Sequence, residues 1–118
     1  MRAFIGLVLG ITASAAAADE IDDAHRQAVA GRDSYWNCLA QEYSRDRHNG
    51  VSGQEFGALL AGACPSERQN FRVTLVNYLA MQFPSEEAGA HVTTANNAIA
   101  LAQKDIVAAF VKPTAASK

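Results

Sequence analysis

"DSYWNCLAQEY", residues 33–43, contains the only tryptophan of the chain and the first of its two cysteines. Cys38 could serve as a nucleophile, as a metal ligand or as half of a disulfide bond. Three features distinguish these roles: the helical stripe on which Cys38 lies, the compartment in which the chain folds, and the position of the second cysteine, Cys64. Together they favour the disulfide.

The N-terminus has the three parts of a secretory signal peptide. Arg2 provides a positive start, residues 3–11 (AFIGLVLGI) form an apolar run, and residues 12–18 (TASAAAA) end in small residues that suit cleavage after Ala18. A membrane anchor is the alternative, but a spanning helix needs about 20 apolar residues. We therefore expect a signal peptide over residues 1–18 and a periplasmic or secreted protein without a membrane span after cleavage.

The mature chain, residues 19–118, is mildly acidic. Loss of Arg2 leaves nine basic residues against twelve acidic ones, a formal charge of −3 without blocks of like charge. This balance argues against nucleic-acid binding, which calls for a basic patch. It also gives no reason to expect binding to an anionic membrane surface. An unidentified protein partner and the oligomeric state stay open.

Residues from about Asp19 to Arg47 are expected to form the first helix. Gly31, in its middle, allows either a bend or the close approach of another helix. Asn49-Gly50 is a turn signal that ends the segment. The apolar stripe has spacings of three and four, as one helical face requires: Ile21, Ala24, Ala28, Gly31, Tyr35, Cys38 and Glu42.

Local signals set the bounds of two further helices. Ser52, with Glu55 three residues later, is a capping-box pattern that opens the second helix. Pro65 interrupts that helix and can begin a third one, over residues 65–82. Phe83-Pro84 ends the third helix, because the residue before proline avoids helical angles. The apolar face of the second helix comprises Phe56, Leu59, Leu60 and Ala63.

The fourth helix is expected to start after Ser85, whose hydroxyl can cap it, and to run to about Val111. Residues 113–118 are expected to form a flexible tail. The apolar stripe of the fourth helix comprises Ala88, Val92, Ala95, Ile99, Ala102, Ile106 and Ala109. Four helices that bury one stripe each make an all-α protein, a small four-helix bundle with a single domain over residues 19–112.

Two cysteines in an exported chain have one intramolecular pairing, Cys38 with Cys64. A helical hairpin that turns near residue 50 puts both cysteines at similar heights, which permits the bridge. A catalytic cysteine would need a histidine base, and the spacings of Cys38 to His25 and His48 are not diagnostic. A redox pair would usually read C-x-x-C, and this motif is absent from the sequence. Free thiols and an intermolecular bridge are the alternatives to the predicted structural disulfide.

Two interpretations apply to the aromatic residues near Cys38. Trp36 can pack beside the disulfide in the core. Alternatively, Trp36 and Tyr43 line an exposed interaction surface, since tryptophan and tyrosine are favoured anchors at interfaces.

No pattern in the sequence predicts a catalytic site, a metal site or a cofactor. Asp22 and His25, three residues apart, could hold a metal only weakly, because a zinc site needs three or four ligands. His48 is expected in a loop and His91 on a helix flank, and the polar segment at residues 93–98 is expected to face solvent.

Trp36-Asn37-Cys38, followed by Cys64 and "PSERQNF", resembles a broad set of small exported two-cysteine helical proteins of proteobacteria. Trp36, Cys38, Cys64 and Phe71 also give a fainter similarity to the HdeA-type periplasmic acid-stress chaperones. That resemblance implies a chaperone that acts at low pH.

Three functions are therefore expected in decreasing order of support. The first is a non-enzymatic binding or interaction module of the periplasm. The second is an acid-activated chaperone, because protonation of twelve carboxylates would leave a strongly positive, loosened chain. The third is a hydrolase that uses Glu42 or Glu55.

Overall fold

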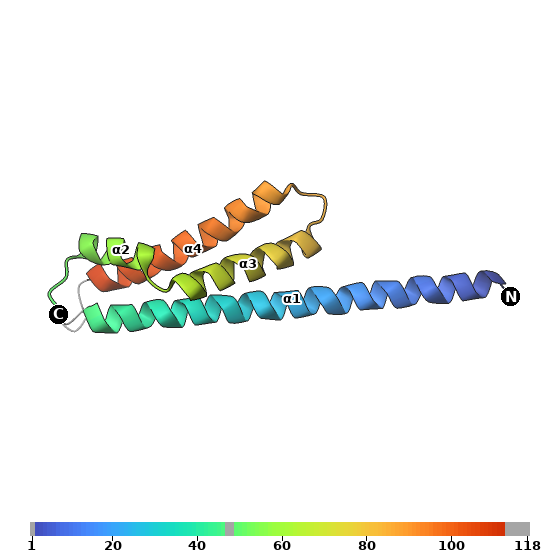
Figure 1. The fold of residues 1–118 in the computed structure, drawn as a ribbon, viewed down its shortest axis with the longest axis horizontal. Helices are drawn as coiled ribbons and strands as arrows, with labels where there is room; N and C mark the ends of the chain where they lie inside the picture. Colours follow the sequence, from blue (N-terminus) through green and yellow to red (C-terminus); the bar gives the residue numbers. More distant parts are fainter. Residues whose placement is uncertain (1, 47–48, 113–118) are drawn as a thin grey trace.

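Four α-helices and their loops make up the described part of the chain, residues 2–46 and 49–112 of a computed structural model (Figure 1). They are α1 (Arg2–Asp46), α2 (Gly53–Gly62), α3 (Pro65–Gln82) and α4 (Ala88–Val111). No strand occurs within these residues, so the predicted all-α bundle is confirmed. The predicted tail at residues 113–118 and the predicted loop position of His48 lie outside the described residues.

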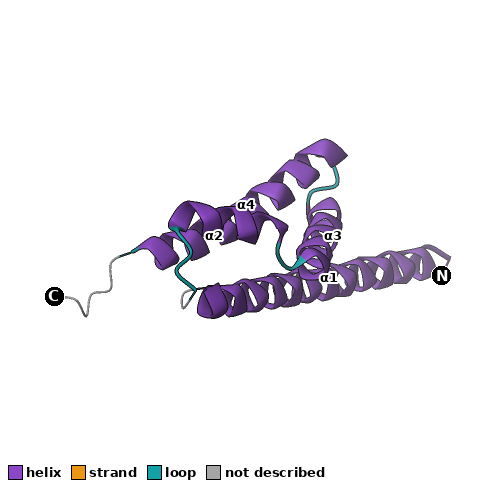
Figure 2. Ribbon diagram, turned by 60° about the vertical axis from the view of Figure 1, so that its left-hand side comes forward, coloured by secondary structure: helices purple, strands orange, loops and turns teal. Residues whose placement is uncertain are grey.

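The chain passes along the bundle three times. α1 runs in one direction, α2 and α3 return, and α4 runs back again (Figure 1). α3 lies along α1 and makes the most extensive helix–helix contact of the described residues, whereas α2 contacts α4 more than α1 (Figure 2). The turn near residue 50 suggested that α1 pairs with α2. The main antiparallel partner of α1 is instead α3.

Gly53 allows the start of α2 to lie close against α4. A Cβ added to Gly53 would overlap Cγ1 of Val111, and one added to Gly57 would lie 3.7 Å from Cγ2 of Val107. Because glycine has no side chain, the backbone of α2 can approach α4 closely at Gly53, whereas the position of Gly57 would accept a Cβ in ordinary van der Waals contact.

The first helix begins earlier than expected. It starts at Arg2 instead of about Asp19 and continues without interruption through the predicted signal peptide. Alanine, leucine and isoleucine are tolerated well in helices, and no proline breaks the segment. The N-terminal part of α1 extends past the other helices (Figure 1), which accounts for the 76 Å length of the molecule. Cleavage after Ala18 stays a prediction.

α1 and α3 approach each other closely at Gly31. A Cβ added there would lie 2.8 Å from Oγ1 of Thr74 and 3.2 Å from Cα of Phe71. The Thr74 hydroxyl donates a hydrogen bond of 2.8 Å to the carbonyl oxygen of Asn70, which holds it at this position. Of the two roles left open for Gly31, a close approach is the one observed.

Side chains from all four helices form one core. Tyr35 and Leu39 of α1 and Phe56 and Leu60 of α2 are completely buried. The phenol oxygen of Tyr35 accepts a hydrogen bond of 2.9 Å from Nε2 of Gln103, so its polar end has a partner. Burial of one large apolar side chain stabilises a fold by about 1.5–3 kcal/mol. The remaining buried members of the core are Cys64, Phe71, Ile99 and Ala102.

The two serine caps have different outcomes. The Ser52 hydroxyl oxygen accepts a hydrogen bond of 3.1 Å from the backbone N–H of Glu55, which confirms the predicted start of α2. The prediction for Ser85 is wrong, because α4 begins at Ala88 and Glu87 is its N-cap residue. The backbone N–H of Glu86 donates to the carbonyl oxygen of Phe83 instead, so a turn precedes the helix.

The buried stripe of α4 begins at His91, whereas Ala88 and Val92, its expected first members, are exposed. His91 is only 3% exposed, whereas Val92 is 41% exposed, so the prediction of a flank position for His91 is wrong. Nδ1 of His91 lies 3.7 Å from Oε2 of Glu86. In α2, Leu59 was expected on the apolar face but is 51% exposed, so that prediction is also wrong. Further along the stripe of α4, Ala95, Ile99 and Ala102 are buried as predicted, and Ile106 is half-buried. The prediction for Ala109 is wrong, because this residue is exposed near the end of α4.

Candidate functional site

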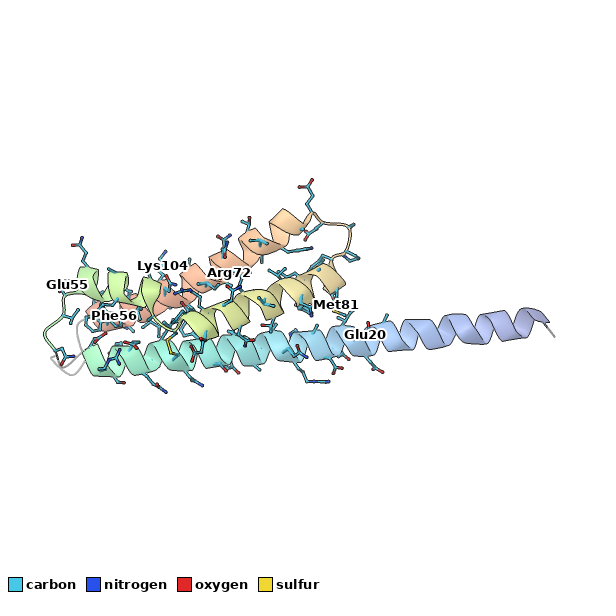
Figure 3. All side chains as sticks on the ribbon, viewed as in Figure 1. Glu20, Glu55, Phe56, Arg72, Met81 and Lys104 are labelled. Carbon is cyan, nitrogen blue, oxygen red and sulfur yellow. A yellow bond between two sulfur atoms is a disulfide. The ribbon has the colours of Figure 1, made fainter. Side chains whose placement is uncertain are left out.

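The predicted disulfide is confirmed. Cys38 and Cys64 are bonded, with their Cα atoms 6.2 Å apart, a usual separation for a disulfide. Figure 3 shows the bond between α1 and the corner at which α2 meets α3. Neither cysteine of the chain is therefore available as a thiol.

Several interactions fix the corner around Cys64. Cys64 has positive backbone angles (φ 54°, ψ 50°) and is the N-cap residue of α3, with Pro65 in the first turn. Such angles are uncommon for a residue that carries a side chain. Nη1 of Arg68 donates to the carbonyl oxygens of Ala61 (2.7 Å) and Ala63 (3.2 Å). These bonds satisfy carbonyl groups that the end of α2 leaves without helical partners.

Trp36 and Tyr43 lie at the edge of the core. Both are partly buried and pack against the buried cluster. The ring of Tyr43 meets Phe56 and Phe110 edge-on, at centroid distances of 6.3 and 5.8 Å. Trp36 packs against the buried cluster that includes Cys64, which is compatible with the first interpretation. Whether the outer edges of the two rings form an interaction surface stays a prediction.

The candidate metal ligands lie in two places. Asp22 and His25 lie on α1, where the His25 ring packs edge-on against Tyr78 at a centroid distance of 5.0 Å. Within the described residues, the one group of three potential ligand atoms within 4.8 Å of one another belongs to Cys38, Cys64 and Glu67. Zinc binds thiolates, and the two sulfurs are bonded to each other instead.

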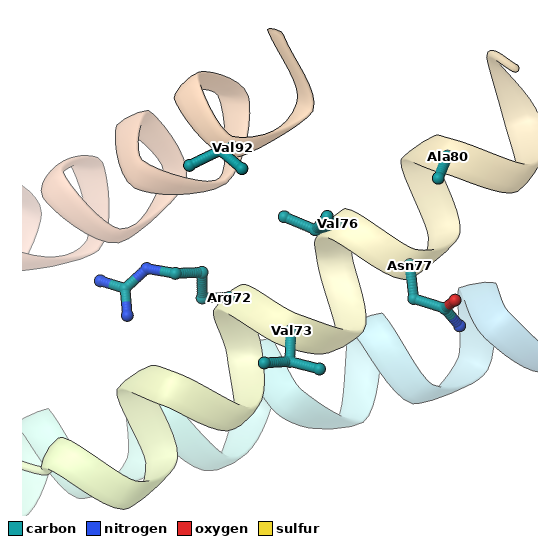
Figure 4. Close-up of a pocket in the computed structure, with 6 residues that line it drawn as sticks. All are labelled: Arg72, Val73, Val76, Asn77, Ala80 and Val92. Carbon is teal, nitrogen blue, oxygen red and sulfur yellow. The ribbon is translucent and has the colours of Figure 1, made fainter. Parts of the chain in front are cut away.

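A groove on the described surface lies between α3 and α4, and we call it the α3–α4 groove (Figure 4). Its volume is about 460 Å³, within the range of about 300–1,000 Å³ that small-molecule sites usually have. Val73 and Val92 are 54% and 41% exposed. The residues that line it are Arg72, Val73, Val76, Asn77 and Ala80 of α3 and Val92 of α4.

Arg72 is the charged residue of this groove. Its side chain lies between α3 and α4 (Figure 3, Figure 4). Nε donates a hydrogen bond of 2.9 Å to Oδ1 of Asn96, and Nη1 donates to Oε1 of Gln69. Both acceptors are neutral amides, and no carboxylate of the described residues forms an ion pair with Arg72. The guanidinium is thus oriented but not neutralised.

Sequence reasoning did not identify the α3–α4 groove. A signal for it exists, because Val73, Val76 and Ala80 recur at spacings of three and four on a second face of α3. Val92 was assigned to the core, and Asn96 was assigned to a solvated face. The groove forms because α4 turns His91 inward and leaves Val92 beside Val76 (Figure 4).

A second, smaller hollow lies mainly between α1 and α3. Its volume is about 260 Å³, and His25, Arg32 and Tyr78 contribute polar groups to its lining. Arg32 already pairs with Asp33 at 3.1 Å, so its charge is partly compensated. This hollow therefore offers less to a charged ligand than the α3–α4 groove does.

Comparison of the chain with protein-family models, with curated proteins and with solved structures finds no match. Over the described residues, none of the helices combines the length and the apolar character that crossing a bilayer requires.

Proposed function

We propose that this protein is exported to the periplasm or secreted, and that it works there by binding, not by catalysis. The observation that carries the proposal is the α3–α4 groove, with its exposed valines and an arginine that has no carboxylate partner among the described residues. Exposed apolar groups grouped around a few polar ones are typical of ligand sites. The signal-like N-terminus and an oxidised cysteine pair are both compatible with export.

The positions of the candidate catalytic groups support a binding role. Both cysteine sulfurs are joined in the disulfide. Glu42 forms an ion pair with Arg45, and Glu55 is exposed in the first turn of α2. A general acid or base needs a reacting partner held within hydrogen-bond reach, and a nucleophile needs an activating base. The ion pair of Glu42 with Arg45 and the position of Glu55 in the first turn of α2 are instead interactions that stabilise helices.

An uncharged fluorescent probe tests the binding role. N-phenylnaphthylamine, whose emission rises in apolar surroundings, should bind the folded, oxidised protein saturably at neutral pH. Val73→Asp should weaken this binding at least about tenfold, because covering a polar group without a hydrogen-bond partner costs about 1–3 kcal/mol and a carboxylate costs more. Leu101→Asp changes an apolar residue of similar exposure (56%) outside the groove and should leave binding unchanged. Absence of saturable binding would refute the proposal.

Export has a separate test. The chain expressed with its own N-terminus should accumulate in the periplasmic fraction with the mass of residues 19–118 and one disulfide. Retention of residues 1–18 in that fraction would contradict cleavage. A cytoplasmic, reduced protein would contradict export itself.

The acid-stress chaperone is a second candidate. The observation that favours it is the exposure of further large apolar side chains, Leu59, Phe83 and Val111, which are 46–56% exposed. The disulfide would keep the helices joined while low pH loosens their packing. Light scattering of an aggregating client at low pH tests this role, and no suppression at a stoichiometric dose would exclude it.

A further inference from the structure

We propose that the α3–α4 groove binds an anionic single-chain amphiphile, with the alkyl chain on the valines and a carboxylate at Arg72. This inference rests on the proposed binding function and names the class of ligand. It uses two properties of the groove, its apolar lining and its single cation.

The lining suits an alkyl chain. Val73, Val76 and Ala80 lie on one face of α3, and Val92 faces them from α4 (Figure 4). Residues 72 to 80 cover about 12 Å along the helix at 1.5 Å per residue, which fits a chain of medium length. Val73 and Val92 are about half exposed, so a bound chain would remove their apolar surface from water.

The cation suits an anionic head group. Arg72 is the only charged residue in the lining. Its guanidinium has five N–H donors in a planar fork, and the two hydrogen bonds observed use Nε and Nη1. Nη2 has no acceptor among the described residues, so donors remain for a carboxylate. Asn96 and Gln69 hold the fork in place without adding a negative charge.

The size of the groove favours a small ligand over a protein. A stable protein–protein interface uses about 20–30 residues on each side. The α3–α4 groove has six lining residues and a volume of about 460 Å³. A second copy of the chain or a client peptide would need a much larger surface. An amphiphile of medium length matches both the volume and the charge.

Competition against N-phenylnaphthylamine tests the inference on the oxidised protein. Decanoate and decanol share an alkyl chain and differ in the head group, and both should displace the probe. Arg72→Gln should weaken the binding of decanoate about tenfold. A hydrogen bond to a charged group at a half-exposed site changes the affinity by about this factor. Decanol should keep its affinity in the same variant.

Further variants keep the test independent of folding. Asn96→Asp keeps Arg72 but places a carboxylate at its Nε, so it should also weaken decanoate and spare decanol. Arg26→Gln removes an exposed arginine of α1 that pairs with Asp23, and it should change neither affinity. Circular dichroism of each variant should match that of the parent protein.

The outcomes separate the inference from the proposed function. If the probe does not bind, both are refuted. If the probe and decanol bind, but Arg72→Gln and Asn96→Asp leave decanoate unchanged, the binding function stands and the anionic ligand is refuted. If sedimentation shows probe binding only by a dimer, the groove is an interface between copies, and the inference is again refuted.

Discussion

Replacing Gly31 by alanine should destabilise the bundle, although helix propensity alone predicts the opposite. In the interior of a solvated helix, Gly→Ala stabilises by about 1 kcal/mol. At Gly31, however, the new methyl group would lie 2.8 Å from Oγ1 of Thr74 and 3.2 Å from Cα of Phe71. The Thr74 side chain can rotate to another rotamer, but Cα of Phe71 is backbone. α3 must therefore move away from α1.

The magnitude follows from two opposing effects. Overpacking a well-packed contact costs about 1–3 kcal/mol, and the gain in helix propensity offsets about 1 kcal/mol of it. The displaced segment carries Phe71, which is 4% exposed and belongs to the core. We therefore expect a net loss of about 1 kcal/mol, which lowers Tm by about 4–8 °C in a domain of this size.

Urea and thermal unfolding followed by circular dichroism measure this change. Gly89→Ala is the matched control, because no atom lies within 4 Å of a Cβ added to Gly89 in α4. It should be neutral or stabilising. Thr74→Ala combined with Gly31→Ala should recover part of the loss, since one of the two close contacts disappears. A Gly31→Ala variant as stable as Gly89→Ala would show that the contact between α1 and α3 is not close enough to matter.

Three further changes test other parts of the fold. Replacing Cys38 and Cys64 together by alanine should lower the free energy of unfolding by about 3.5 kcal/mol, because the bridge closes a loop of 26 residues; equal unfolding midpoints of the two proteins would contradict this. Ser52→Ala should lower the free energy of unfolding by about 1 kcal/mol, because it removes an N-cap. Ser85→Ala should change the free energy of unfolding by no more than about 0.5 kcal/mol. Calorimetry measures both changes, and the reverse order would show that Ser85 is the cap. Phe56→Ala should cost about 3–5 kcal/mol, as for other buried aromatics; chemical denaturation measures it, and a loss below 1 kcal/mol would mean that Phe56 is not a central core residue.

Helix ends that depend on neighbouring residues were largely predictable. Ser52 begins α2 and Pro65 begins α3, and both signals act through backbone hydrogen bonds or φ angles within one turn. Ser85 failed because a second local option, the turn from Phe83 to Glu86, competes for the same backbone. Propensity alone did not show which option wins.

The face that α4 buries was not predictable in its first turns. His91 and Val92 are separated by one helical step of about 100°, and each fits a stripe with Ala95 by spacing. In the structure, α4 is rotated so that His91 is buried and Val92 is exposed. The same rotation creates the α3–α4 groove, so the candidate site depends on this choice.

The sequence alone predicted the all-α class, most helix bounds and Cys38 with Cys64 as the one possible intramolecular pairing. These follow from backbone chemistry within a few residues and from there being only two cysteines. The packing of α2 on α4, the close approach at Gly31 and the groove beside Arg72 required the tertiary structure. They depend on which helices meet at what distance, and that outcome is set by the whole core at once.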